Sequence, residues 1–304
     1  MSQPLWGIDL GGTKVEGVVI PGPGNVTPIV RKRVDTEAVL GYPHIVARIT
    51  QLVEGMKKES GRHPGTIGIG TPGESDPVTG NMKNCNSVVL NGRPLQRDLE
   101  NALGVPVILA NDANCFALAE AHWGVVKEKY HSARVVFGII MGTGVGGGIV
   151  LDGRTWNGKH GIAGEWGHNF LDDSGGYCYC GKKGCVETVL SGPALEKYYY
   201  SLSGKDVKLK DIVHQATTGE RFAVDTLERL YHFFGKAVSV VVDILDPEVI
   251  VVGGGVGNIP GLYTEGIASL SSFIFNNRLD VPVVPPSLGD SAGVFGAAAL
   301  TLQS

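Results

Sequence analysis

The chain has 304 residues, of which 45 are Gly, and its formal net charge is −4, from 26 Lys and Arg against 30 Asp and Glu. Apolar residues make up 43 % and charged residues 18 %, which excludes a disordered polar chain, and 16 Pro without a Gly-X-Y period exclude collagen. No basic run stands out, and no apolar run reaches the about 18 residues of a membrane span, so we expect no nucleic-acid and no membrane partner. Five Cys without a signal-peptide pattern predict a reducing, cytoplasmic location.

Strand and helix patterns alternate along the chain, which predicts an α/β fold. In the first half, strand patterns occupy 5–12, 17–22, 66–73 and 105–112, and helical patterns occupy 42–58, 95–104 and 116–124. In the second half, we expect strands over 133–144 and 248–257 and helices over 233–247 and 293–300. The segments 8–13 and 140–147 share an apolar strand that runs into Gly and Thr, which favours a duplicated domain.

Three glycine-rich segments follow predicted strands. Their residues are Gly7, Asp9, Gly11, Gly12, Thr13 and Lys14; then Gly142, Thr143, Gly144 and 146–148; then Gly253, Gly254, Gly255 and Gly257. Backbone N–H groups in tight turns bind phosphate well, and the Asp9 carboxylate could hold hydrated Mg²⁺. Any one segment could equally be a hairpin or a bulge, and neither a Rossmann nor a Walker A pattern fits. Three such loops in both halves favour a nucleotide held between two domains.

Asn111 and Asp112 end a predicted strand and precede a predicted helix. Ligands in open α/β sheets bind at the carboxyl ends of strands, so Asp112 is a candidate general base. The alternative is that Asp112 only caps the following helix.

A cluster of metal-ligating residues lies in the second half of the chain. Cys178, Cys180 and Cys185 fall within eight residues, and His168 lies ten residues before the first of them. Three thiols and one imidazole match a tetrahedral zinc site, although three reduced cysteines are the alternative. Cys85 and Cys115 match no ligand pattern and are expected to be buried free thiols.

Seven segments, in chain order, resemble the motifs of ROK sugar kinases, which belong to the actin/sugar kinase/Hsp70 superfamily. They are DLGGTK at 9–14, GTPG at 70–73, NDANC at 111–115, GTGVGGG at 142–148, GEWGH at 164–168, CYCGKKGCVE at 178–187 and LDPEVIVVGGG at 245–255. The resemblance implies two actin-like (ribonuclease H-like) α/β domains with a cleft between them. Residues 1–115 plus 290–304 would form a small N-terminal domain, and 116–289 would form a large domain with the zinc-binding loop.

The resemblance also implies roles for individual residues. Asp112 would accept the proton of the sugar 6-hydroxyl, the three glycine loops would bind ATP with Mg²⁺, and the Cys/His cluster would hold structural Zn²⁺. The sugar would be bound by Asn111, Glu165, His168 and Glu187, with Gly73 and Asn86 close to it. The enzyme would be a homodimer.

The choice of sugar rests on segment 83–92, which, with GEWGHN at 164–169, resembles the fructokinase/mannokinase branch. We therefore expect an ATP-dependent hexose 6-kinase acting on fructose, mannose or glucose. An N-acetylhexosamine kinase of the same family and a non-catalytic sugar sensor are the alternatives. A sugar-independent ATPase would have no need of Asn111, Glu165 or the zinc set.

Overall fold

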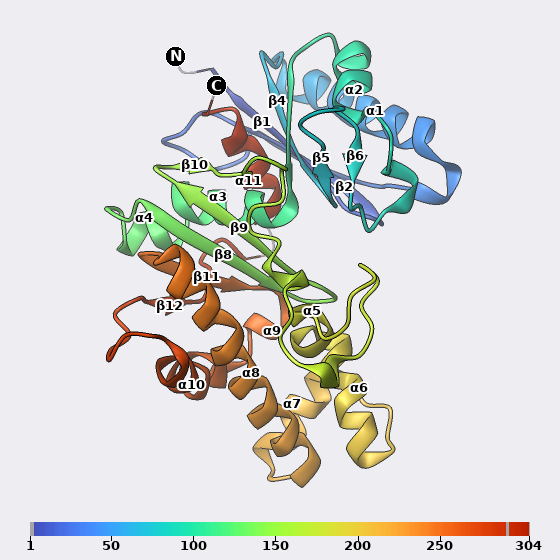
Figure 1. Cartoon of the computed structure of the whole chain (residues 1–304). Helices are drawn as coiled ribbons and strands as arrows, with labels where there is room; N and C mark the ends of the chain where they lie inside the picture. Colours follow the sequence, from blue (N-terminus) through green and yellow to red (C-terminus); the bar gives the residue numbers. More distant parts are fainter. Residues whose placement is uncertain (1–2, 290–291, 304) are drawn as a thin grey trace. The chain divides into compact units, whose positions relative to one another are not determined.

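The computed structural model describes residues 3–289 and 292–303, which form two compact units (Figure 1). Unit 1 contains the described residues up to Ser132, together with Gly148–Ala163 and the described residues from Ser287 onward. Unit 2 contains Ala133–Gly147 and Gly164–Pro286. In the described residues, no helix is both long and apolar enough to cross a membrane.

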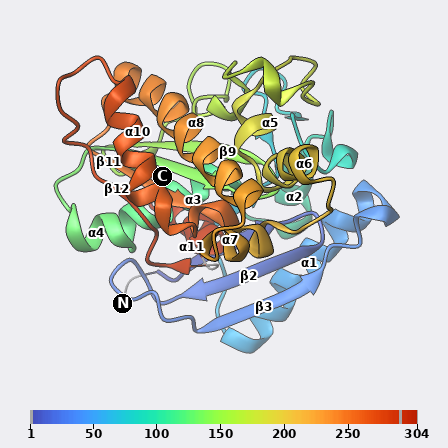
Figure 2. The same ribbon diagram turned by 90° about the horizontal axis from the view of Figure 1, so that it is seen from below.

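The sheet of unit 1 has five strands in the order β3-β2-β1-β4-β7. They are β1 (Leu5–Leu10), β2 (Lys14–Ile20), β3 (Val30–Asp35), β4 (Ile67–Thr71) and β7 (Val107–Asn111). Strands β1, β4 and β7 run parallel to one another, whereas β2 pairs antiparallel with both β1 and β3. Figure 2 shows β2 and β3 side by side. The predicted strands of the first half are confirmed, and β3 is an addition to them.

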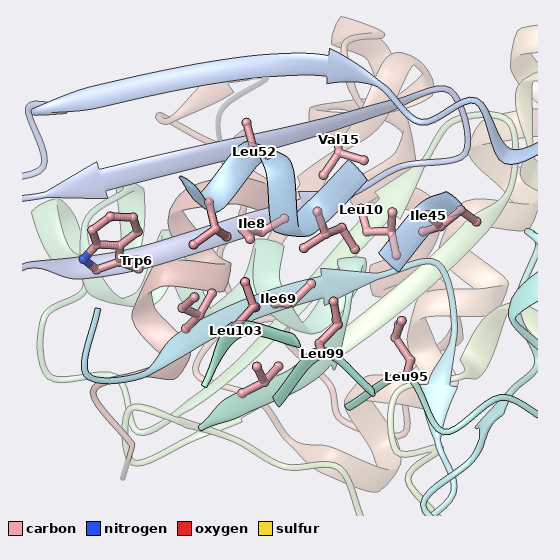
Figure 3. Packing of buried hydrophobic residues seen from close by; sticks show 14 of the residues in the cluster. Trp6, Ile8, Leu10, Val15, Ile45, Leu52, Ile69, Leu95, Leu99 and Leu103 are labelled. Carbon is pink, nitrogen blue, oxygen red and sulfur yellow. The ribbon is translucent and has the colours of Figure 1, made fainter. Parts of the chain in front are cut away.

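One face of this sheet carries the apolar core of unit 1. Helices α1 (Tyr42–Ser60) and α2 (Leu95–Leu103) contribute Ile45, Leu52, Leu95 and Leu99 to it, and Figure 3 shows these side chains with those of the strands. Each helix ends at a Gly in the left-handed conformation, Gly61 and Gly104, as is usual for helix C-termini. Because side chains alternate along a strand, Ile8 and Leu10 of β1 point into this core.

The opposite face of the sheet packs against helix α11 (Ala292–Leu300) and helix α3 (Asp112–His122). The approach is so close that a Cβ on Gly7 would lie 2.4 Å from the Ala298 backbone nitrogen, and a Cβ on Gly68 would lie 1.8 Å from the Ala297 carbonyl oxygen. The assignment of Gly7 to a phosphate loop is therefore wrong, since this glycine makes room for a helix.

The compact units divide the chain differently from the predicted domain boundaries. Residues 116–132 and 148–163 lie in unit 1, since α3 packs on α11 and the buried Asn114 side chain accepts a hydrogen bond from the Ile149 N–H at 3.3 Å. The predicted final helix is α11; positions 1, 2, 290, 291 and 304 of the expected small domain lie outside the described residues. Short elements complete unit 1, namely β5 (Glu74–Ser75), β6 (Met82–Lys83), α4 (Val125–Lys129) and β10 (Arg154–Thr155).

The second sheet repeats the strand order of the first, as β10-β9-β8-β11-β12. Its further strands are β8 (Val135–Met141), β9 (Val145–Leu151), β11 (Val249–Gly253) and β12 (Val283–Val284), and β11 runs parallel to both β8 and β12. The segments 8–13 and 140–147, whose sequences resemble each other, contain the ends of β1 and β8 and the glycine turn that follows each of these strands. The repeated order agrees with the predicted duplication.

Helices make up most of the rest of unit 2. Helix α8 (Arg221–Leu245) packs along helix α10 (Glu265–Phe273), as Figure 1 shows. Helix α8 ends before Pro247, as predicted. The other helices are α5 (Val186–Leu190), α6 (Gly192–Ser203), α7 (Leu209–Thr217) and the short α9 (Gly254–Gly257). The predicted α/β class is confirmed, and the two five-stranded sheets of like strand order agree with the expected actin-like fold.

Candidate active site

Three parallel strands of unit 1 end at one edge of its sheet and bring acidic residues together there. Asp9 in β1 lies opposite Gly70 in β4, and Thr71 lies opposite Asn111 in β7. A Cβ on Gly70 would be 3.2 Å from Cys115 Sγ and 3.5 Å from Asp9 Oδ1, so Gly70 lies directly beside this carboxylate. Asp9 and Asp112 are close enough that the charge of Asp112 acts on Asp9.

The two carboxylates have pKa values above the ordinary range. Burial raises the pKa of Asp9 to about 6, the charges of Asp112 and Glu16 add to this, and Arg33 opposes it. The Asp112 side chain is accessible to solvent, yet partial removal of water by the surrounding protein raises its pKa, and the Ala113 N–H at 2.7 Å opposes this. Carboxylates of raised pKa are stronger bases and are common at functional sites.

The first turn of α3 shows which residue caps this helix. Asn111 is the N-cap, and its side chain accepts a hydrogen bond from the Asn114 N–H at 2.8 Å. Asp112 is therefore not the N-cap residue, although its carboxylate accepts the Ala113 N–H of the same turn at 2.7 Å. Asp112 is the first helical residue, and its carboxylate is held at the carboxyl end of β7.

The turn between β1 and β2 is tight and is held by two hydrogen bonds. The Gly11 N–H donates to the Lys14 carbonyl at 2.9 Å, and the Thr36 hydroxyl donates to the Gly11 carbonyl at 2.8 Å. Gly12, Thr13 and Lys14 are exposed at its tip. The structure thus gathers the predicted residues 11–14 in one tight turn that begins two residues after Asp9.

The predicted sugar residues of unit 1 also adjoin one another. A Cβ on Gly73 would lie 2.7 Å from Cys85 Cα, so the loop 70–73 touches the segment after β6. The Asn86 N–H donates to the Pro72 carbonyl at 3.1 Å, and the Asn86 side chain is exposed. Gly73 and Asn86 therefore lie side by side.

In unit 2, two glycine loops meet because they follow parallel neighbouring strands. Gly253 of β11 lies opposite Ile140 of β8, and Gly254, with φ of +83°, packs so that a Cβ would be 2.3 Å from the Met141 carbonyl oxygen. The turn after β8 is closed by a hydrogen bond from the Gly142 N–H to the Gly144 carbonyl at 2.9 Å. A Cβ on Gly142 or Gly255 would meet nothing within 4 Å. Backbone at these two positions is open to a ligand.

The Cys/His cluster is assembled by a folded-back loop. The bridge between Phe170 and Cys185 brings the segment after His168 alongside Cys185, and the Cys178 N–H closes a turn on the Lys182 carbonyl at 2.8 Å. Gly181 and Gly184 take left-handed φ values of +86° and +73° in this loop.

The four predicted ligand atoms converge as a metal site requires. The ligand atoms of His168, Cys178, Cys180 and Cys185 all lie within 4.8 Å of one another. Cys178 Sγ is 3.6 Å from His168 Nδ1, and Cys180 Sγ is 3.6 Å from Cys185 Sγ. With bonds of about 2.3 Å to sulfur and about 2.0 Å to nitrogen, tetrahedral zinc ligands lie about 3.5–3.8 Å apart, so the donor set fits zinc.

Two glutamates flank this cluster, as the resemblance implies. Glu165 directly precedes the 3₁₀ turn Trp166–His168, which is held by a hydrogen bond from the Trp166 indole to the Gly146 carbonyl at 3.1 Å. Glu187 lies in α5, two residues after Cys185, and its carboxylate accepts a hydrogen bond from the Val145 N–H at 3.0 Å.

Tyr179 is a residue of this site that the sequence interpretation missed. Its hydroxyl lies 3.1 Å from His168 Nε2, and the two rings meet edge to face with centroids 5.2 Å apart. Partial removal of water by the surrounding protein raises the pKa of Tyr179 to about 12, and the charges of Glu187 and Glu165 add to this. The signal in the sequence is a hydroxylated aromatic residue between two cysteine ligands, where the Cys-x-Cys spacing draws attention to the thiols alone.

Comparisons with known proteins agree over nearly the full length of the chain. The sequence model of the ROK family matches residues 5–304. An N-acetyl-D-glucosamine kinase of Histophilus somni is 37 % identical, over 98 % of this chain and 99 % of that protein. The ROK hexokinase structure from Thermus thermophilus has a TM-score of 0.88 at 31 % identity, covering 99 % of both chains. A ROK family glucokinase from Streptomyces griseus, in complex with glucose and AMPPNP, has a TM-score of 0.80 at 28 % identity, covering 99 % of this chain and 100 % of that one.

Proposed function

The chain belongs to the ROK family of sugar kinases, and from this we propose that it transfers the γ-phosphoryl group of ATP to the 6-hydroxyl of N-acetyl-D-glucosamine. The observation that carries the proposal is the placement of Asp112 in the first turn of α3, beside Asp9, with Asn111 as the helix cap.

Asp112 is the proposed general base. The substrate hydroxyl oxygen attacks the γ-phosphorus, its proton passes to the Asp112 carboxylate, and the bond to the β–γ bridging oxygen breaks to release ADP. The raised pKa of Asp112 makes its carboxylate a better proton acceptor than an ordinary aspartate. Asn111 and Asn114 hold the first turn of α3 and so fix the direction of this carboxylate.

Phosphate binding is proposed for the glycine turns of both units. In unit 1 the turn formed by residues 11–14 presents backbone and the Thr13 and Lys14 side chains, and in unit 2 Gly142 and Gly255 leave backbone uncovered. Thr143, Gly144 and Gly254 belong to the same two turns of unit 2. Asp9 is the residue that would hold hydrated Mg²⁺, which neutralises phosphate charge when it is bound.

The Cys/His cluster is proposed to hold structural zinc. A closed set of four protein ligands leaves no position for a reacting water, so its role is to fix the loop. This loop carries His168 and sets the start of α5, where Glu187 lies. We propose that Glu165, His168 and Glu187 bind sugar hydroxyls from unit 2, and that Gly73, Asn86 and Asn111 do so from unit 1.

The choice of sugar differs from the fructose, mannose or glucose expected from segment 83–92. A full-length relative at 37 % identity is an N-acetyl-D-glucosamine kinase, which favours the N-acetylhexosamine alternative. A free hexose is the second candidate, because a hexokinase and a glucokinase are among the similar structures. We further propose a cytoplasmic homodimer, as the family resemblance implies.

Turnover of a sugar panel tests this proposal. We expect kcat/KM to be highest for N-acetyl-D-glucosamine, with glucose, mannose and fructose behind it in a coupled ADP assay. A higher kcat/KM for a free hexose would overturn the choice of sugar and leave the kinase assignment in place. ³¹P NMR of the product identifies the phosphorylated hydroxyl, and a phosphate at any position but 6 would contradict the proposed regiochemistry.

A further inference from the structure

The hydroxyl of Tyr179 lies among the three side chains proposed to bind the sugar from unit 2. It is 3.1 Å from His168 Nε2, and the charges of Glu187 and Glu165 both act on it. Tyr179 itself stands between the proposed metal ligands Cys178 and Cys180, so metal binding would fix its backbone on both sides.

The orientation of His168 decides which way the hydrogen bond runs. Its Nδ1 faces Cys178 Sγ at 3.6 Å and belongs to the converging ligand set, so this is the nitrogen that would bind a metal. A metal-bound imidazole keeps its proton on the other nitrogen, so Nε2–H donates to the Tyr179 oxygen and, as a bifurcated bond, also to the sugar hydroxyl that His168 is proposed to bind. Since that oxygen is already accepting, the Tyr179 O–H is left to donate elsewhere.

We propose that Tyr179 is a sugar-contacting residue, whose hydroxyl is oriented by His168 and donates a hydrogen bond to an oxygen of the substrate. The inference rests on the proposed sugar-kinase function and adds one residue to its binding site. Tyr179 is 67 % exposed, so a ligand can reach it.

The test is Tyr179→Phe, which keeps the ring against His168 and removes only the hydroxyl. Tyr177→Phe is a matched control, because Tyr177 lies in the same loop, is 87 % exposed, and its hydroxyl makes no hydrogen bond that the described residues show. The sugar dissociation constant is measured by calorimetry on the metal-loaded protein without nucleotide, first with N-acetyl-D-glucosamine and then with glucose. Zinc content and ADP affinity are measured in parallel.

We expect Tyr179→Phe to weaken sugar binding about 3- to 10-fold, the range of one neutral hydrogen bond. The sugar KM should rise by the same factor, and kcat, zinc content and ADP affinity should stay as in the wild type and in Tyr177→Phe. If affinity falls for N-acetyl-D-glucosamine alone, the acceptor is the acetamide oxygen. If affinity falls equally for glucose, the acceptor is an oxygen common to both sugars.

Two results would overturn the inference. One is unchanged sugar affinity in a zinc-loaded Tyr179→Phe protein. The other is loss of zinc from this variant, which would assign the hydroxyl to the metal loop instead of to the substrate. Failure of the proposed function is a separate result, since in that case the wild-type protein itself would bind neither sugar.

Discussion

The carboxylate of Glu187 accepts a hydrogen bond from the backbone N–H of Val145 at 3.0 Å. This contact joins the helix that follows the metal loop to the strand that follows a glycine loop. Gly144 allows it, because a Cβ there would lie 2.6 Å from Glu187 Oε2. Within unit 2, the Glu187 side chain thus connects the proposed sugar-binding segment to the proposed phosphate-binding segment.

Replacing Glu187 tests this connection. In Glu187→Gln the charged acceptor is lost, and hydrogen bonds to charged groups contribute about 1.5–3 kcal/mol. We expect kcat/KM for the sugar to fall roughly 10- to 100-fold and ADP affinity to weaken as well. The control is Glu228→Gln, at an exposed position of α8. Unaltered sugar kinetics in Glu187→Gln would refute the role of this residue.

Asp112→Asn separates chemistry from binding. The amide keeps the shape of the side chain and cannot accept the hydroxyl proton, so kcat should fall by about 10²- to 10⁴-fold. Sugar affinity, measured by calorimetry, should stay within about threefold of the wild type. Asp206→Asn, in the exposed loop before α7, should leave both quantities unchanged. Near-normal turnover in Asp112→Asn would contradict the assignment of Asp112 as the general base.

Asp9 gives the stability of the protein a pH dependence. Its pKa is about 6 in the folded chain, chiefly because of burial, against an ordinary value of 3.8. The folded state therefore binds this proton more tightly than the unfolded state, and stability falls as pH rises from about 4 to about 6.

Asp9→Asn should remove this pH dependence, because Asn resembles the protonated carboxyl group. The variant should be more stable than the wild type at pH 7–8, and the difference should shrink towards pH 4. Urea unfolding without added Mg²⁺ or nucleotide measures it. An equal difference at every pH would show that the carboxyl charge is not the cause.

Local sequence patterns predicted a large part of the fold and of the site. Strands that end in glycine-rich turns, and Cys and His residues at the spacing of metal ligands, can be recognised without tertiary information. Residue type and spacing along the chain are sufficient to identify them. The role of Gly7 could not be recognised in this way, since it depends on contact with Ala298 of α11, at the far end of the chain. The contact between Tyr179 and His168 likewise exists only once the metal loop is folded.

Gly68→Ala should destabilise unit 1. The added Cβ would lie 1.8 Å from the Ala297 carbonyl oxygen, so α11 must shift away from the sheet. Overpacking of this kind costs about 1–3 kcal/mol or more, which urea unfolding can measure. Gly24→Ala is the control, because a Cβ there meets nothing within 4 Å. Equal stability of the two variants would contradict the close packing described for α11.

Cys178→Ser tests the metal site. One zinc ion per chain is expected in the wild type by elemental analysis, and little in the variant, since one of four ligands is weakened. Limited proteolysis should then cleave near Lys182 and Lys183, which lie in the metal loop. The control Cys85→Ser lies outside the cluster and should keep its zinc. Wild-type protein that is free of metal and fully active would exclude a structural ion.

The central claim is phosphoryl transfer from ATP to a sugar hydroxyl, and the stoichiometry of the products tests it most directly. The purified protein is incubated with ATP and Mg²⁺, with and without N-acetyl-D-glucosamine, and ADP and sugar phosphate are both quantified. The account predicts ADP release only when sugar is present, with one sugar phosphate formed per ADP. ADP release that is independent of sugar, or ADP without sugar phosphate, would contradict it.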